Sequence, residues 1–145
     1  AWYMEEIAAR IRELGLEKSV RTFFRPFTTD EIVLFHSASD MVVLPYKDIT
    51  QSAALFTAMA FGKAIIATAV GGFTETLKDG KTALLVNYDD SGGLASAILR
   101  LARSPEEMTA LGSGALEELK MNYSWDRIAQ MTMEYYMSVS TAHGS

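Results

Sequence analysis

The sequence predicts an α/β protein with a Rossmann-like parallel sheet of about four strands and helices on both faces. Two observations carry this prediction. The strand-like runs, such as residues 41–44 and 64–68, are uniformly apolar, which is typical of strands buried on both faces. Helical patterns separate those runs along the chain, as in βαβ units. With 145 residues, of which 49% are hydrophobic and 21% charged, we expect a single domain over residues 1–145.

The first third of the chain is predicted to contain a helix, a strand and a second helix. Apolar residues recur at helical spacing over residues 4–14, and Gly15 ends that helix. Residues 20–24 form a short run of β-forming residues, which predicts a strand. Thr28 and Glu31 have the spacing of a capping box, so a helix is expected to follow.

The middle of the chain alternates strands with helices. A continuous apolar strand over residues 41–44 is followed by a polar loop and then by an apolar helix, for which Ser52 is the predicted N-cap and Gly62 the end. A second buried strand spans residues 64–68. After it, Gly71 and Gly72 form a turn.

The remainder begins with short elements and becomes helical. A short helix is expected at residues 74–77, a turn at 79–80 and a strand at 82–86. Three longer helices follow at residues 93–103, 105–120 and 125–139. Ser104 and Ser124 are the predicted N-caps of the last two. We expect the polar end, residues 140–145, to be a disordered tail.

Composition excludes several classes of function. The net charge is −5 and the thirteen basic residues are scattered, so a nucleic-acid interface is not expected. The chain contains no cysteine, which excludes disulfides and thiolate metal sites and suits a cytoplasmic protein. Its two histidines, His36 and His143, are too few for a histidine metal cluster. No apolar run approaches the length of a transmembrane helix.

The loops that follow the strands are the expected place for a ligand, because open parallel sheets bind ligands at the carboxyl ends of their strands. Three loops meet this condition, at residues 25–29, 45–52 and 69–74. The middle loop leads into a helix at Ser52, where free amides and the helix dipole favour an anion such as a phosphate. Ser52 is equally compatible with a structural cap on a buried helix.

Other polar residues of these loops also have two readings. Gly71 and Gly72 could let a ligand approach the backbone or could simply form a turn. Lys47 and Asp48 could contact a phosphate and a sugar hydroxyl, or form a solvated pair. The sequence contains no Ser/His/Asp set, GxSxG elbow, Walker loop or GxGxxG motif. A response-regulator-like receiver is an alternative from another class of protein, but the acidic cluster and the lysine that it should carry after its strands are not visible.

Three segments resemble one known family. The stretches ASDMVVLPY, AMAFGKAIIATAVGGFTETLKDGKTALLV and ALGSGALEELKMNYSWDRIAQMTMEYY are similar to the C-terminal half of GT-B glycosyltransferases, closest to retaining family four, also called group 1. The resemblance runs over about residues 20–139. It implies a hexosyltransferase-like activity, in which a sugar passes from a nucleotide-diphosphate donor to an acceptor without a metal or other cofactor.

The resemblance also implies a set of donor-binding residues. The diphosphate would meet the backbone at the start of the apolar helix, the nucleobase would lie near Arg25 and Phe27, and the double glycine would lie near the donor. The implied set from the middle of the chain is Lys47, Asp48, Ile49, Thr50, Gln51, Ser52, Ala53, Thr57, Gly71 and Gly72.

The sequence departs from the family pattern at two acidic positions. Family members usually carry two glutamates separated by seven residues, and the matching positions here are Ile49 and Thr57. Asp48 is adjacent to the first position and could replace it. Threonine is a poor replacement for a carboxylate that holds ribose hydroxyls through charge-assisted hydrogen bonds. The sequence therefore does not supply the carboxylate that usually holds the ribose.

The sequence also resembles only part of such an enzyme. It begins at what looks like the helix before the third strand of the donor domain, so the acceptor domain and the first two donor-domain strands are not represented. We therefore expect no sugar transfer by this chain alone. An exposed sheet edge would favour a homodimer, so the alternative is a non-catalytic module of the same ancestry that binds a nucleotide or dimerises.

Overall fold

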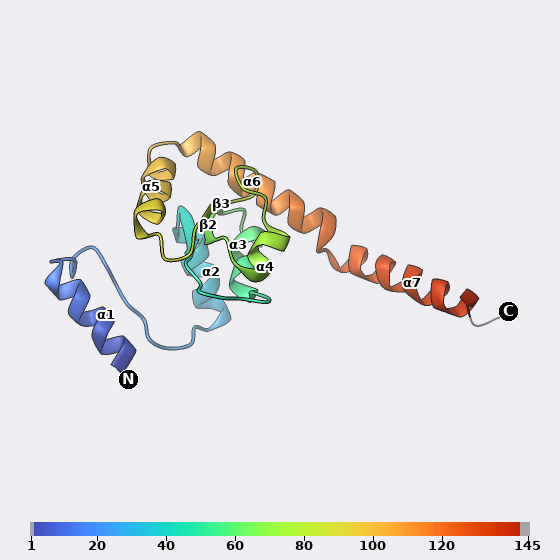
Figure 1. The fold of residues 1–145 in the computed structure, drawn as a ribbon, viewed down its shortest axis with the longest axis horizontal. Coiled ribbons are helices and arrows are strands. Elements are labelled where there is room, and N and C mark those ends of the chain that lie inside the picture. The colour runs from blue at the N-terminus through green and yellow to red at the C-terminus, as the bar shows by residue number, and fades with distance from the viewer. Residues whose placement is uncertain (1, 143–145) are drawn as a thin grey trace. The chain divides into compact units, whose positions relative to one another are not determined.

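The computed structural model describes residues 2–142, and the side chains of residues 2–139 (Figure 1). The chain divides into two compact units, Ala1–Val33 and Leu34–Ser145, which are described separately below.

The first unit contains helix α1, Trp2–Glu13, and an extended connection. Gly15 ends the helix with a positive φ of 66°, and its amide donates to the Arg12 carbonyl. The predicted strand at residues 20–24 is wrong, because within residues 2–142 this run belongs to none of the strands of the sheet and all its residues are exposed. Its β-forming residues favour an extended backbone locally. A strand requires in addition a neighbouring strand or a surface that buries it.

The capping box predicted at the start of α2, Thr29–Ala38, is confirmed. The Glu31 amide donates to the Thr28 hydroxyl at 3.3 Å, and the Thr28 amide donates to the Glu31 carboxylate at 3.0 Å. Two amides at the start of the helix are thereby satisfied reciprocally.

The second unit contains the parallel sheet. Within the described residues it has three strands in the order β1-β2-β3: Met41–Leu44, Ala64–Thr68 and Leu84–Val86. The register pairs Val43 with Ile66 and Ile66 with Leu84. The sheet is parallel as predicted, but it has three strands rather than about four. The third strand begins two residues later than predicted because the Thr82 hydroxyl instead accepts a hydrogen bond from the Lys78 amide.

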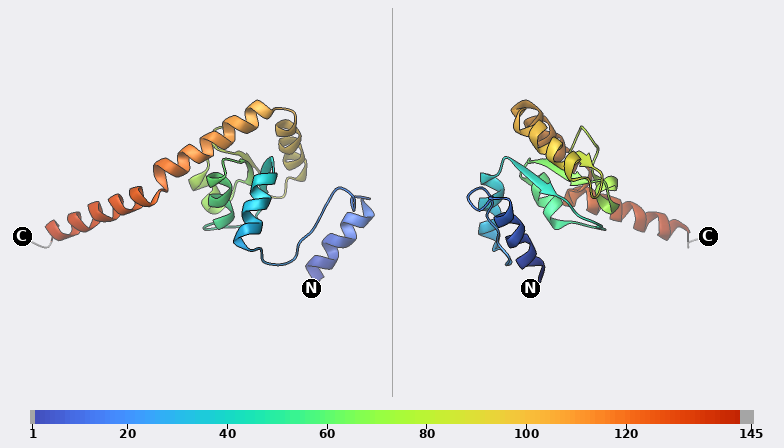
Figure 2. Two further views of the ribbon diagram at one scale, coloured as in Figure 1. Left: turned by 180° about the vertical axis from the view of Figure 1, so that it is seen from behind. Right: turned by 60° about the vertical axis from the view of Figure 1, so that its left-hand side comes forward.

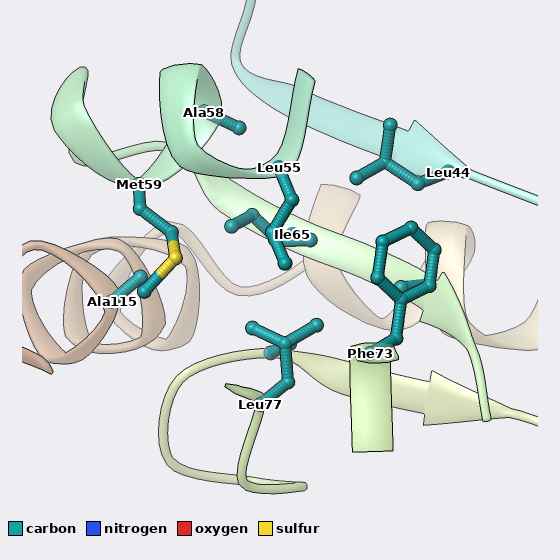
Figure 3. Close-up of a cluster of buried hydrophobic side chains, with 10 residues drawn as sticks. Leu44, Leu55, Ala58, Met59, Ile65, Phe73, Leu77 and Ala115 are labelled. Atoms are coloured by element: carbon teal, nitrogen blue, oxygen red, sulfur yellow. The ribbon is translucent and has the colours of Figure 1, made fainter. Parts of the chain in front are cut away.

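Helices cover both faces of the sheet, as predicted. They are α3 Ala53–Ala60, α4 Gly71–Thr76, α5 Ser91–Ala102 and α6 Pro105–Asn122. On one face Ile65 packs with Leu55 and Met59 of α3 and with Phe73 of α4 (Figure 3). On the other face Ile66 of the same strand packs against α5 and α6. Strand β2 is therefore buried from both sides, which explains why its residues 64–67 are all apolar.

Helix α6 approaches the sheet connections closely because it carries two glycines at the contact. A Cβ at Gly112 would overlap the carbonyl oxygen of Gly62, and a Cβ at Gly114 would overlap that of Lys81. An ion pair between Lys78 and Glu118, at 2.6 Å, adds a polar contact on the same side of the helix. It lowers the pKa of the Glu118 carboxyl through the hydrogen bond from Lys78.

Helix α7, Trp125–Ala142, follows α6 and extends away from the sheet (Figures 1 and 2). Arg127 is half-buried, and the other side chains over residues 125–139 are exposed. The helix includes residues 140–142 of the expected tail, and residues 143–145 lie outside the described part of the chain. Among the described helices, none combines the length and apolar character that crossing a bilayer requires.

Candidate functional site

The loop between β1 and α3, residues 45–52, lies at the carboxyl edge of the sheet and forms the candidate site. Its residues differ in burial: Tyr46 and Ile49 are half-buried and Ser52 is buried. The remaining predicted site residues of the loop are exposed. They are Lys47, Asp48, Thr50 and Gln51. The buried and half-buried side chains thus attach the loop to the protein, while these four side chains face solvent.

Three contacts fix the conformation of this loop from neighbouring elements. The Tyr46 ring stacks on Phe73 of α4 with a centroid distance of 5.4 Å. The Thr68 hydroxyl donates to the Tyr46 carbonyl oxygen at 2.6 Å. The Gly72 amide donates to the Ile49 carbonyl oxygen at 2.8 Å. The loop is therefore attached to the end of β2 and to the start of α4.

Helix α3 begins at this loop and presents its amino end. Ser52 has an extended backbone conformation, and its hydroxyl oxygen accepts a hydrogen bond from the Leu55 amide at 3.2 Å. The structure therefore confirms Ser52 as an N-cap. The first amides of a helix have no acceptor within it, so those of Ala53 and Ala54 remain for other partners. The helix sequence, AALFTAMA, contains no charged residue, so its own side chains leave the helix dipole unopposed.

A hollow of about 190 Å³ opens beside this amino end. The loop and α3 supply part of its wall, α4 contributes Gly72 and Glu75, and Tyr123 contributes from the end of α6. The other lining residues are Thr50, Gln51, Ser52, Leu55, Phe56, Phe73 and Thr76. Ligand cavities for whole drug-sized molecules usually exceed about 300 Å³, so this hollow fits a phosphate or diphosphate better than a complete nucleotide.

The double glycine serves the loop directly. Gly71 has a positive φ of 44°, and a Cβ there would overlap the Ile49 carbonyl oxygen. A Cβ at Gly72 would overlap the Thr50 carbonyl oxygen. Close packing of α4 against the loop therefore leaves no room for a side chain at either glycine. The predicted turn is wrong, because both glycines lie in the first turn of α4, and the group that they approach is the backbone of the loop.

Thr57, one of the two positions that differ from the family pattern, lies one turn into α3. Its side chain is half-buried, and its hydroxyl donates to the Ala53 carbonyl oxygen at 2.8 Å. The hydroxyl proton is therefore already used within the helix. Ile49, the other position, turns its carbonyl to Gly72 and is half-buried.

Arg25 and Phe27, the residues expected near a base, belong to the first unit. The Arg25 guanidinium donates two hydrogen bonds to the Glu31 carboxylate, at 2.9 and 2.5 Å, and lies 5.2 Å from the centroid of the Phe27 ring. The hydrogen bond from Arg25, followed by that from the Thr28 amide, lowers the pKa of Glu31 to about 2. The structure thus brings Arg25 and Phe27 together within their unit.

Sequence reasoning missed a second hollow at the carboxyl edge, of about 210 Å³. It is lined by the segment after β3, which includes Asn87, Asp89 and Asp90, and by Pro45 and Thr68. The signal that could have found it is positional, because this segment also follows a strand of the parallel sheet. It carries two carboxylates, Asp89 and Asp90, whereas the first hollow carries one, Glu75, so an anionic ligand is less favoured here. Asp90 also caps α5 by accepting a hydrogen bond from the Gly93 amide at 2.7 Å.

Over residues 2–142, no group of three or more acidic or histidine side chains is arranged to hold a metal ion.

A three-stranded parallel sheet with helices on both faces and a helix amino end at its carboxyl edge is the arrangement of a Rossmann-like α/β domain. The protein-family model for the family described as glycosyl transferases group 1 matches residues 3–104 of the chain. The chain therefore belongs to the group 1 glycosyltransferase family, and its fold is that of part of a GT-B glycosyltransferase. The resemblance seen in the sequence is confirmed.

Individual relatives agree with this assignment. The chain is 30% identical over 138 residues to the D-inositol 3-phosphate glycosyltransferase of Corynebacterium urealyticum, covering 95% of this chain and 31% of that protein. Sucrose-phosphate synthase from Thermosynechococcus elongatus superposes with a TM-score of 0.82 at 29% identity, over 95% of this chain and 34% of its own. HepE of Anabaena in complex with UDP superposes with a TM-score of 0.84 at 26% identity. The match covers 94% of this chain and 37% of the HepE chain. The chain thus spans about a third of the length of these relatives.

Proposed function

We propose that this chain is the donor-binding portion of a glycosyltransferase and binds the diphosphate of a nucleotide-sugar. The observation that carries the proposal is the uncharged helix α3, whose capped amino end opens into a hollow of diphosphate size. Family membership supports it, as do HepE structures solved with UDP and with UDP-glucose, at 26% and 25% identity.

The proposal gives each part of the loop a role. The backbone amides from Thr50 to Ala53 receive the diphosphate, and the exposed ammonium of Lys47 adds the positive charge that the helix itself lacks. Asp48 accepts a hydrogen bond from a hydroxyl of the sugar. Binding needs no metal ion or other cofactor. Because Thr57 donates its proton within α3, it contributes little to holding the ribose.

We further propose that the chain does not transfer sugar by itself and that it acts in the cytoplasm. Transfer requires groups that stabilise the leaving diphosphate and that position the acceptor in the transition state. The candidate site offers amides and one lysine on the donor side. The remaining two thirds of the relatives' length lie outside the match, so the acceptor and the sugar are not identified by it.

The proposal is tested by thermal-shift titration with UDP, GDP, ADP and their sugar conjugates. A ligand present at one hundred times its dissociation constant, and bound only to the folded state, stabilises by about 2.7 kcal/mol. We expect a saturable shift with one base. The absence of a shift with every nucleotide at millimolar concentration would contradict donor binding.

Ala53→Asp locates the site within that experiment, with Ala53→Asn as the matched control. Ala53 is exposed at the first position of α3, where a carboxylate improves the helix by about 0.3–1 kcal/mol through the dipole. The same charge repels a diphosphate. We therefore expect Ala53→Asp to retain stability and lose binding, while Ala53→Asn retains both.

The second candidate is a homodimer formed through the edge of the sheet. Within the described residues, β1 pairs with β2 alone, so its other edge has backbone groups available for a second strand. Light scattering at increasing protein concentration tests it, with Val43→Pro to block an added strand. A strictly monomeric protein at all concentrations would exclude this candidate.

A further inference from the structure

Thr68 is an unusual residue in its setting. It is the last residue of β2, whose sequence AIIAT is otherwise apolar, and its side chain is in the buried interior with only 4% exposed. A buried hydroxyl costs free energy unless it is hydrogen-bonded, so its partner reveals why a polar residue is accepted there.

The Thr68 hydroxyl reaches out of its own strand to the neighbouring loop. The ladder between β1 and β2 ends with the pair Leu44 and Ala67, and β1 stops at that point. Beyond it, the hydroxyl donates to the Tyr46 carbonyl oxygen at 2.6 Å, while the Leu44 carbonyl oxygen lies at the limit of contact, 3.5 Å. The side chain thus supplies the next link after the backbone ladder has ended.

This link anchors the beginning of the site loop, and a second link anchors its end. The Gly72 amide holds the Ile49 carbonyl at 2.8 Å. Between the two anchors lie Lys47 and Asp48, both exposed. The backbone that carries them is therefore fixed on both sides by groups that come from β2 and α4.

We propose that Thr68 is a positioning residue of the donor site, which sets the direction of the loop at Tyr46 and thereby the placement of Lys47 and Asp48. This inference rests on the proposed function for its effect on ligand binding. Its structural part, the control of the loop by a single hydroxyl, is independent of any ligand.

The test compares Thr68→Val with Thr68→Ser. Valine keeps the shape and the β-forming character of threonine and removes the donor, whereas serine keeps the donor. The first readout needs no ligand: hydrogen exchange of the Gly72 amide, which reports on the far anchor of the loop. We expect exchange to accelerate roughly tenfold in Thr68→Val, as for the loss of a hydrogen bond to a half-buried carbonyl, and to return to the original rate in Thr68→Ser.

Exchange at Ile65 and Ile66 is the internal control, because a general loss of stability would accelerate it as well. Faster exchange at Gly72 alone supports the proposal. An unchanged rate at Gly72 in Thr68→Val, or equal acceleration throughout β2, would overturn it. If Thr68→Val does not fold, the exchange rate of the Thr68 hydroxyl proton is measured in the unmodified protein. Slow exchange is expected for a proton donated to the Tyr46 carbonyl oxygen, and rapid exchange would contradict the contact.

UDP affinity is the second readout and separates this inference from the proposed function. If the unmodified protein binds UDP, we expect weaker binding in Thr68→Val and restored binding in Thr68→Ser; equal affinity in all three would overturn the role in the donor site. If the unmodified protein binds no nucleotide, the proposed function fails, and the exchange experiment still decides whether Thr68 positions the loop.

Discussion

The amide of Gly72 donates a 2.8 Å hydrogen bond to the carbonyl oxygen of Ile49, joining the start of α4 to the loop before α3. These two residues are far apart in the sequence, and the contact requires a residue without a side chain, because a Cβ at Gly72 would overlap the Thr50 carbonyl oxygen. The shape of the candidate site is therefore determined by packing between two helix starts.

Replacing Gly72 by alanine is expected to destabilise the protein by about 1–3 kcal/mol, as overpacking of a closely packed contact does. Gly92→Ala is the matched control, since Gly92 also occupies the second position of a helix and its Cβ would meet only the Asp90 carboxylate at 3.6 Å. That change should be neutral or stabilise by up to about 1 kcal/mol. Urea unfolding measures both, and equal effects would contradict the packing account.

The Glu31 carboxyl is expected to titrate at about 2 in the unmodified protein. A native pKa below the ordinary value of 4.5 stabilises the fold at neutral pH, and this contribution is lost as the pH falls from about 4.5 through about 2. In Arg25→Met the pKa should rise toward 4.5, while the Thr28 amide still keeps it lower. NMR titration measures it, with Arg21→Met as the control that leaves it unchanged. A Glu31 pKa near 4.5 in the unmodified protein would refute the contact.

Thr57→Glu is expected to strengthen nucleotide binding, because it places a carboxylate where the family pattern has one. A charge-assisted hydrogen bond to a ribose hydroxyl should raise UDP affinity roughly tenfold. Affinity for inorganic pyrophosphate, which has no ribose, should not increase. Calorimetry with both ligands tests this, with Thr57→Gln as the uncharged control. An equal gain for both ligands would show that the side chain acts elsewhere.

Ending the chain after Ser124 is expected to leave the stability of the sheet unit almost unchanged. Side chains of α7 over residues 125–139 are exposed apart from the half-buried Arg127, so their removal takes little from the core. We expect a change in unfolding free energy within about 0.5 kcal/mol, the usual range for exposed residues. A loss of several kcal/mol in urea unfolding would mean that α7 packs against the core.

Local signals predicted most elements correctly. The uniformly apolar strands β1 and β2 were evident from composition alone, and the hydroxyl of Ser52 and the pair Thr28 and Glu31 form the caps expected of them. Each of these features depends on residues within a few positions of one another, where sequence patterns carry most of their information.

Features that depend on distant residues were missed or misread. Residues 20–24 have strand-forming composition, yet a strand requires a neighbouring strand, and the described sheet consists of β1, β2 and β3. The role of Gly71 and Gly72 became clear only from the loop carbonyls that they approach. Thr68 received no role in the sequence because its partner, Tyr46, lies across the sheet.

The measurement that tests the central claim most directly is a UDP titration followed through the backbone amide resonances. If the amino end of α3 receives the diphosphate, the largest saturable changes will occur at residues 50–54 and at Gly72, and Ala53→Asp will abolish them. Saturable changes centred on the hollow at Asn87–Asp90, or no changes at millimolar UDP, would contradict the assignment of the donor site to this helix.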